Sequence, residues 1–173
     1  GVWVAATSAE TAALAAARGL PLLLGMHVPA AAHRALRGTY DAVARAHGHD
    51  PATVPHAAAH LAQVADSREE AAAALRARMP SWVATTGRYV RLDGTAGPGR
   101  EPAAYVDHLI DIHPVGPPAH CVAVLREAVR VSGVRRLLLL VEGSGDPEVT
   151  VANIARLGAQ VLPALRAGAP APR

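Results

Sequence analysis

Two hydroxyl side chains mark the start of the first helix that the sequence predicts. Ser8 and Thr11 lie three residues apart, just after an apolar run at residues 2–6. This spacing puts both hydroxyls on one side of the first helical turn, where backbone N–H groups are unpaired and the helix dipole is positive. A phosphate gains hydrogen bonds and dipole stabilisation in such a place. The alternative is that Ser8 only caps the helix, and the spacing alone favours that simpler interpretation.

Three further segments follow apolar runs in the same way, at residues 25–27, 65–67 and 142–146. In parallel α/β folds, functional residues gather beyond the carboxyl ends of the strands. His27 is therefore a candidate ligand contact or proton donor, although filling the rim of a barrel is a simpler role. The glycine-rich turn at 142–146 permits close approach of a ligand, but a single G-x-G fits an ordinary loop equally well.

Other site types find little support. His108, His113, His120 and Cys121 fall in a short stretch, but their spacing neither shares one helical face nor matches a zinc pattern. We therefore expect no metal. No G-x-S-x-G follows a strand and no Walker loop is present, which argues against an α/β-hydrolase and a P-loop NTPase.

The elements that position these residues alternate between short apolar runs and longer helical patterns. Strands are predicted at residues 2–6, 20–24, 57–64 and 135–141, and helices at 8–18, 29–47, 67–79, 102–110, 118–131 and 147–167. Residues 80–101 are predicted to be irregular, and 113–118 to form a proline-rich turn. The alternation favours a parallel sheet whose strands at 22–24 and 137–141 are covered on both faces. A small doubly wound sheet and part of a (β/α)8 barrel both fit this pattern.

Composition narrows the function classes. Hydrophobic residues make up 51% of the 173 residues, yet no apolar run is long enough to span a membrane. The single cysteine, Cys121, excludes an internal disulfide framework, and no secretion signal is evident, so we expect a soluble cytoplasmic protein. All 17 basic residues are arginines, interleaved with acids, and aromatic residues make up only 3%. That distribution argues against nucleic-acid binding, which needs a basic patch and stacking platforms.

The motifs together resemble a known family. Residues 2–11 and 15–21, followed in order by YDAVARAHGH (40–49), VADSREE (64–70), HPVGPP (113–118), EGSGD (142–146) and VLP (161–163), look like the C-terminal half of bacterial-luciferase-type flavin-dependent monooxygenases. The resemblance implies a (β/α)8 TIM barrel to which this chain contributes strands 5–8. It implies one domain over residues 1–167, and the composition of the Ala/Pro/Arg-rich tail at 168–173 predicts that the tail is disordered.

The resemblance also implies a function and a cofactor site. An enzyme of this family would use reduced FMN and O2 to oxidise a small organic substrate, and its partners would be a flavin reductase and the N-terminal barrel half. The resemblance implies that the FMN phosphate is bound by the backbone of Thr7 and by Ser8 and Thr11. Gly25 and Met26 would lie near the isoalloxazine ring. The family has an acidic residue where Thr7 stands, so this position departs from the pattern.

Some features of the family are missing or altered. The first four strands, which carry the family's catalytic histidine, a phosphate-binding arginine and most of the dimer interface, have no counterpart here, so we assign no catalytic residue. The complete protein is expected to be a homo- or heterodimer. Residues 86–105 stand in the place of the family's mobile active-site loop, but this segment is shorter than the loop of the light-emitting subunits, which argues against light emission. A non-catalytic flavin-binding subunit and a deazaflavin-dependent oxidoreductase remain as alternatives.

Overall fold

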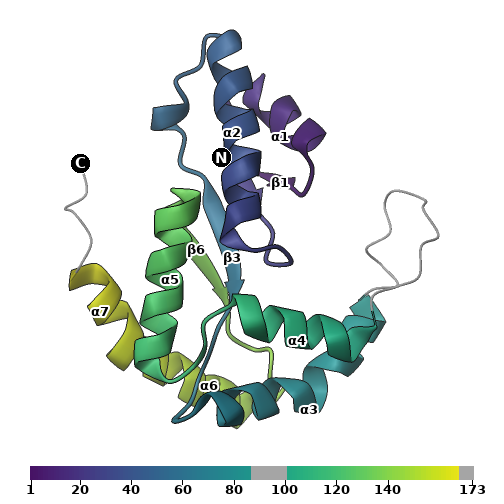
Figure 1. Ribbon diagram of the computed structural model, residues 1–173, viewed down its shortest axis with the longest axis vertical. Coiled ribbons are helices and arrows are strands. Elements are labelled where there is room, and N and C mark those ends of the chain that lie inside the picture. The colour runs from purple at the N-terminus through teal and green to yellow at the C-terminus, as the bar shows by residue number, and fades with distance from the viewer. Residues whose placement is uncertain (87–100, 168–173) are drawn as a thin grey trace. The chain divides into compact units, whose positions relative to one another are not determined.

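The main sheet has four strands, in the order of the chain. The computed structural model describes residues 1–86 and 101–167. Strands β1 (Val4–Ala6), β2 (Leu22–Leu24), β3 (Ala57–Leu61) and β6 (Arg136–Leu140) form the sheet in the order β1-β2-β3-β6. Figure 1 labels β1, β3 and β6 of this sheet. β1 runs parallel to β2 with Ala6 opposite Leu24, and β2 runs parallel to β3 with Leu23 opposite Ala57. The predicted parallel α/β fold is therefore confirmed, and no barrel closes within the described residues.

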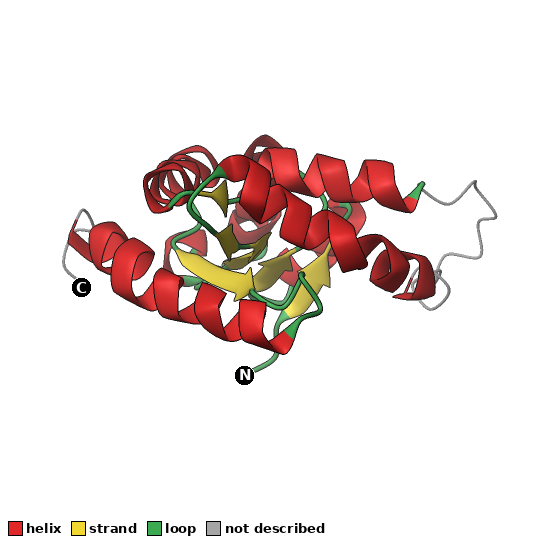
Figure 2. Ribbon diagram, turned by 90° about the horizontal axis from the view of Figure 1, so that it is seen from below, coloured by secondary structure: helices red, strands yellow, loops and turns green. Residues whose placement is uncertain are grey.

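Helices make up most of the described chain (Figure 2). They are α1 (Ala9–Ala16), α2 (Ala30–Ala46), α3 (Arg68–Thr86), α4 (Pro102–Ile112), α5 (Pro118–Ser132), α6 (Pro147–Arg156) and α7 (Leu162–Ala167), with short turns η1 (Pro51–Thr53) and η2 (Leu157–Val161). Each strand of the main sheet is followed by at least one helix, as the sequence predicted. The predicted tail at 168–173 lies outside the described residues.

The strand predicted at residues 57–64 is in fact two strands. The N–H of Ala62 still donates to the carbonyl of Leu140, at 2.9 Å, but the next N–H, that of Gln63, donates to Pro114 at 3.1 Å. Here the chain changes partner, and β4 (Gln63–Val64) pairs in parallel with β5 (Val115–Gly116) in a second, two-stranded sheet. The prediction of a simple turn at 113–118 was wrong because a two-residue strand leaves no periodic signal.

Two helices near prolines also differ from the predicted helices. α3 continues through Pro80 to Thr86, whereas the sequence predicted irregular chain from residue 80. The loss of one N–H at Pro80 is tolerated because α3 packs along α4, with an ion pair of 2.7 Å between Arg76 and Asp107. The helix predicted at 147–167 is interrupted by the π-turn η2, which widens the helix just before Pro163.

The described chain forms two compact units. The first comprises Gly1–His60 with Leu125–Leu139, and the second the described residues of Leu61–Val124 with Leu140–Arg173. In the first unit α1 and α2 lie side by side (Figure 1). Alanines are the most numerous residues of its buried core, which consists of Ala6, Ala12, Ala15, Ala16, Leu22, Leu24, Tyr40, Ala44, Ala58 and Val134.

The edge strand β6 is more exposed than predicted. Leu22 and Leu24 of β2 are fully buried, but Leu138 of β6 keeps 47% of its surface exposed. The prediction that residues 137–141 are covered on both faces is therefore wrong for this chain. β6 ends the sheet order, so no further strand of the described chain lies beyond it.

Candidate functional site

The hydroxyls of Ser8 and Thr11 meet at the start of α1. Ser8 has extended backbone angles, and its Oγ accepts a hydrogen bond from the Thr11 N–H at 3.2 Å. The two hydroxyl oxygens, Ser8 Oγ and Thr11 Oγ1, are also 3.2 Å apart. The sequence was right to place both on one side of the first turn and to make Ser8 the N-cap. This geometry satisfies the capping role and leaves the phosphate role a prediction.

A carboxylate already interacts with this helix start. Glu10 is fully exposed in the first turn of α1. Hydrogen bonds from its own backbone N–H and from the Ser8 hydroxyl hold the pKa of the Glu10 carboxyl below its ordinary value. An anionic group is thus stabilised where unpaired N–H groups and the positive end of the helix dipole coincide. The same donors can serve a phosphate if the Glu10 side chain turns away.

Gly25 lies at the same carboxyl-terminal end of the parallel strands as Thr7. Ala6 and Leu24 are paired across β1 and β2, so Thr7 and Gly25 are each the first residue beyond the paired strands. A Cβ on Gly25 would lie 2.4 Å from Cε1 of the His27 ring, far too close for two carbon atoms. Glycine therefore permits the His27 ring to lie against the backbone here. The two segments predicted to bind a flavin are brought to one edge by parallel pairing.

His33 fixes the position of Gly25 and was not singled out from the sequence. Its Nε2 lies 2.8 Å from the Gly25 carbonyl oxygen, and because a carbonyl only accepts, Nε2 donates. His33 is 1% exposed, and burial lowers its pKa, so the ring is neutral near pH 7. A signal for it existed: His33, Leu36, Tyr40 and Ala44 share the helical spacing of a buried face.

The other two strand-end segments serve local structure. Ser144 is buried, and its hydroxyl accepts from the Asp146 N–H at 3.3 Å, while Asp146 caps α6 by accepting from Glu148 and Val149. A Cβ on Gly143 would lie 2.8 Å from a methyl of Leu75, so close packing accounts for this glycine. These contacts support the interpretation of 142–146 as an ordinary loop.

Residues 65–67 likewise start a helix. Ser67 Oγ accepts from the Glu70 N–H at 3.0 Å, and the Glu70 carboxylate accepts from the Asp66 N–H at 3.1 Å. Asp66 also pairs with Arg156 at 2.6 Å, and this interaction lowers the pKa of the Asp66 carboxyl. Ser67 therefore caps α3, and the polar groups of this segment are used in the fold.

A buried amide holds the strand ends of the second unit together. Asn153 is 1% exposed, and its Oδ1 accepts from the Val64 N–H at 2.8 Å. Its Nδ2 donates to the carbonyls of Ala62, at 2.8 Å, and Val141, at 3.0 Å. Sequence reasoning missed this residue, although it is the only asparagine of the chain.

The candidate metal residues are not gathered. His113 is buried, and the Cys121 thiol donates to the Gly116 carbonyl at 3.3 Å. Burial raises the pKa of the Cys121 thiol to about 11, so it is unreactive near neutral pH. Residues 1–86 and 101–167 contain no group of three or more side chains of the His, Cys, Asp and Glu types placed to hold a metal ion. Over those same ranges, no helix is both long enough and apolar enough to cross a membrane.

Comparison with known proteins identifies relatives of this chain. The chain matches the luciferase-like monooxygenase family over residues 2–136. It is 22% identical over 186 residues to the alkanal monooxygenase alpha chain of a Kryptophanaron alfredi symbiont, covering 95% of this chain and 51% of that protein. The chain thus spans about half the length of the relatives it matches.

The fold is shared with solved structures, among them a monooxygenase and a dehydrogenase. One is a type II Baeyer–Villiger monooxygenase from Pseudomonas putida, the oxygenating constituent of 3,6-diketocamphane monooxygenase, in complex with FMN. It has a TM-score of 0.66 and 20% identity, and the match covers 94% of this chain and 47% of that one. The other is an F420-dependent secondary alcohol dehydrogenase in complex with an F420–acetone adduct, with a TM-score of 0.66, 18% identity, and coverage of 95% and 48%.

Proposed function

Because the chain belongs to the luciferase-like monooxygenase family, we propose that it supplies the flavin-phosphate side of an enzyme that uses reduced FMN and O2 to oxidise a small organic substrate. β1, β2, β3 and β6 would be strands 5–8 of a (β/α)8 barrel. Strands 1–4 would come from an N-terminal barrel half, in the same polypeptide or in a partner. The match to about half of each relative supports that division.

The observation that carries the proposal is the pair of hydroxyls at the start of α1. Ser8 Oγ and Thr11 Oγ1 are 3.2 Å apart at the helix N-terminus, and the backbone N–H of Glu10 would become available there once the Glu10 carboxylate turns away. An FMN phosphate there would accept hydrogen bonds from both hydroxyls and from the backbone at Thr7. The helix dipole would add to the attraction, and Glu10 would turn outward to relieve repulsion between like charges.

The ring of the flavin would extend toward Gly25 and Met26. Parallel pairing places Gly25 beside Thr7 at the sheet edge, and the His33 hydrogen bond to the Gly25 carbonyl keeps that backbone in place. Reduced FMN would supply the electrons that activate O2. His33 would act as a positioning residue, because its contact is with the Gly25 backbone.

The partners follow from the same proposal. An enzyme that consumes reduced FMN needs a source of it, so a flavin reductase is the expected partner. One relative is named an alpha chain, which supports assembly of the complete protein as a homo- or heterodimer.

A deazaflavin-dependent oxidoreductase is the second candidate function. A dehydrogenase in complex with an F420 adduct has the same fold over 95% of this chain. Such an enzyme would transfer a hydride and would not consume O2. A non-catalytic flavin-binding subunit is the third possibility, and it predicts flavin binding without turnover.

Titration of the complete protein, followed by quenching of flavin fluorescence, tests the phosphate assignment. Ser8→Ala combined with Thr11→Ala should weaken FMN binding at least tenfold and leave riboflavin binding nearly unchanged, because only FMN carries the phosphate. Thr39→Ala is a matched control, since it removes a hydroxyl from α2 whose bond is to the Ala35 carbonyl.

A second variant separates binding from stability. Ser8→Ala costs about 1 kcal/mol through loss of the cap, whereas Ser8→Asp keeps a capping side chain and adds a negative charge. Ser8→Asp should therefore retain thermal stability and lose FMN binding. Equal losses for FMN and riboflavin would refute the phosphate assignment. Binding of F420 in preference to FMN would support the second candidate, and failure of both to bind would remove the flavin hypothesis.

A further inference from the structure

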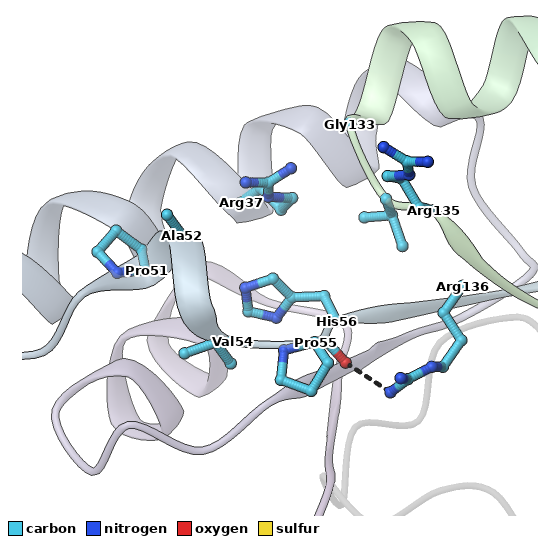
Figure 3. A pocket seen from close by; sticks show the side chains of 10 residues that line it. Arg37, Pro51, Ala52, Val54, Pro55, His56, Gly133, Arg135 and Arg136 are labelled. Atoms are coloured by element: carbon cyan, nitrogen blue, oxygen red, sulfur yellow. Dashed lines mark hydrogen bonds between the residues drawn. The ribbon is translucent and has the colours of Figure 1, made fainter. Parts of the chain in front are cut away.

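A polar pocket opens at the amino-terminal side of β3 and β6, in the first unit. Its volume is about 450 Å³. Figure 3 shows the His56 ring in the pocket together with Arg37 from α2, Arg136 at the first residue of β6, and Arg135 directly before that strand. His56 directly precedes β3, and Leu22 at the start of β2 donates its N–H to this ring at 3.0 Å. The pocket therefore lies at the opposite end of the parallel strands from Thr7 and Gly25.

Two buried donors of this pocket lack an acceptor. His56 Nδ1 accepts from Leu22, so the neutral ring carries its hydrogen on Nε2. Nε2 is buried and finds no hydrogen-bond partner among the described residues, and the same holds for Nε of Arg37. Buried polar groups are nearly always hydrogen-bonded, and an unpaired one is costly. Because both residues line this pocket, an acceptor held there would satisfy these donors.

The charge of the pocket is positive. Asp41 lies 3.7 Å from one end of the Arg37 guanidinium and offsets that charge in part. Arg136 donates to the Pro55 carbonyl at 3.3 Å (Figure 3), and its guanidinium lies 5.3 Å from the centre of the Trp3 ring. These contacts hold Arg136 at the wall of the pocket and supply no negative charge.

The ring of His56 is held rigidly. Tyr40 packs edge-on against it, with the ring centres 4.4 Å apart. Burial and the neighbouring Arg37 lower the pKa of His56 to about 4, so the ring is neutral near pH 7 and Nε2 stays a donor. The donor is thus fixed in direction.

We propose that this pocket binds a small molecule through an oxyanion, a phosphate or a carboxylate. Guanidinium groups recognise both with paired hydrogen bonds, and an oxyanion would accept from the unpaired donors of Arg37 and His56. The remaining wall is largely apolar, formed by Pro51, Val54, Pro55 and Val134, and suits a compact organic body. The site is separate from the proposed flavin site.

Calorimetric titration of the complete protein at constant ionic strength tests the proposal. The probes are inorganic phosphate and succinate, which distinguish the two oxyanions. We expect one of them to bind, and Arg136→Gln and Arg37→Gln each to weaken binding at least tenfold. Arg34→Gln is the matched control, because this exposed arginine of α2 does not line the pocket. Arg136 is exposed, so its variant should fold even if the Arg37 variant does not.

Three results would overturn the proposal. These are no binding of either probe at millimolar concentration, equal weakening by Arg34→Gln, and binding that survives Arg136→Gln unchanged. Ser8→Ala with Thr11→Ala separates this site from the flavin site, because it should leave the binding measured here unchanged. If that double variant abolishes binding, the anion occupies the start of α1 and the pocket is not its site.

Discussion

Replacing the buried amide of Asn153 by alanine should destabilise the protein strongly. The side chain makes three hydrogen bonds, to Val64, Ala62 and Val141, at 2.8–3.0 Å. Each bond contributes about 1 kcal/mol, and the loss is larger where a buried partner is left unpaired. Asn153→Ala leaves the Val64 N–H and two carbonyls without this amide, so we expect a loss of roughly 3 kcal/mol in the free energy of unfolding.

Asn153→Asp probes the polarity of the same contact. The aspartate keeps an acceptor for Val64 but turns a carboxylate toward the carbonyls of Ala62 and Val141. Repulsion and burial should raise its pKa in the folded protein, so protonation favours the fold. The Asp variant should therefore lose more stability than Asn153→Ala at pH 7 and recover part of it as the pH falls toward 4.

Urea unfolding of the complete protein, followed by circular dichroism, gives these free energies. Hydrogen exchange of the Val64 amide reports on the contact directly, and Asn153→Ala should make it exchange faster. Gln160→Ala is the control, because it removes an exposed amide side chain in the next turn of helix. A loss below about 1 kcal/mol in Asn153→Ala, with unchanged protection of Val64, would refute the reasoning.

Three further predictions follow from individual residues. The pKa of His56 is about 4 in the fold against 6.5 ordinarily, so the free energy of unfolding measured in urea should fall by at most about 3 kcal/mol as the pH drops from 6.5 to 4. His56→Asn keeps an acceptor for the Leu22 N–H and should make the free energy of unfolding less dependent on pH over this range. Glu10→Gln should tighten FMN binding severalfold and leave riboflavin binding unchanged, because it removes a negative charge beside the phosphate; an equal change for both flavins would argue against a phosphate there. The 173-residue chain expressed alone should self-associate in analytical ultracentrifugation, because β1 and β6 are open sheet edges and Leu138 is 47% exposed; a monodisperse monomer that melts cooperatively would contradict this.

Local patterns predicted the strand and helix order and the caps. Ser8 caps its helix as predicted, because capping depends only on neighbours in sequence. The sequence also placed Thr7 and Gly25 after consecutive strands, and parallel pairing brought them to one edge. The positions of the candidate flavin-site residues at the strand ends could therefore be predicted from the sequence, and their role in binding stays a prediction.

What the sequence could not provide depends on contacts between distant residues. The Asn153 amide joins residues about 90 positions away, so no local pattern identifies it. The helix passes through Pro80 because packing on α4 outweighs a local preference, and the two-residue strands β4 and β5 exist only through their pairing. His33 was missed for another reason: its helical spacing marks a buried position, but not the Gly25 carbonyl as its partner.

The most direct test of the flavin assignment is a crystal structure of the complete protein with FMN bound. We expect phosphate oxygens within hydrogen-bond distance of Ser8 Oγ and Thr11 Oγ1, with the Glu10 carboxylate turned outward and the flavin ring near Gly25. A phosphate bound elsewhere, with the Ser8 and Thr11 hydroxyls still 3.2 Å apart and in contact only with each other and their own helix, would contradict it.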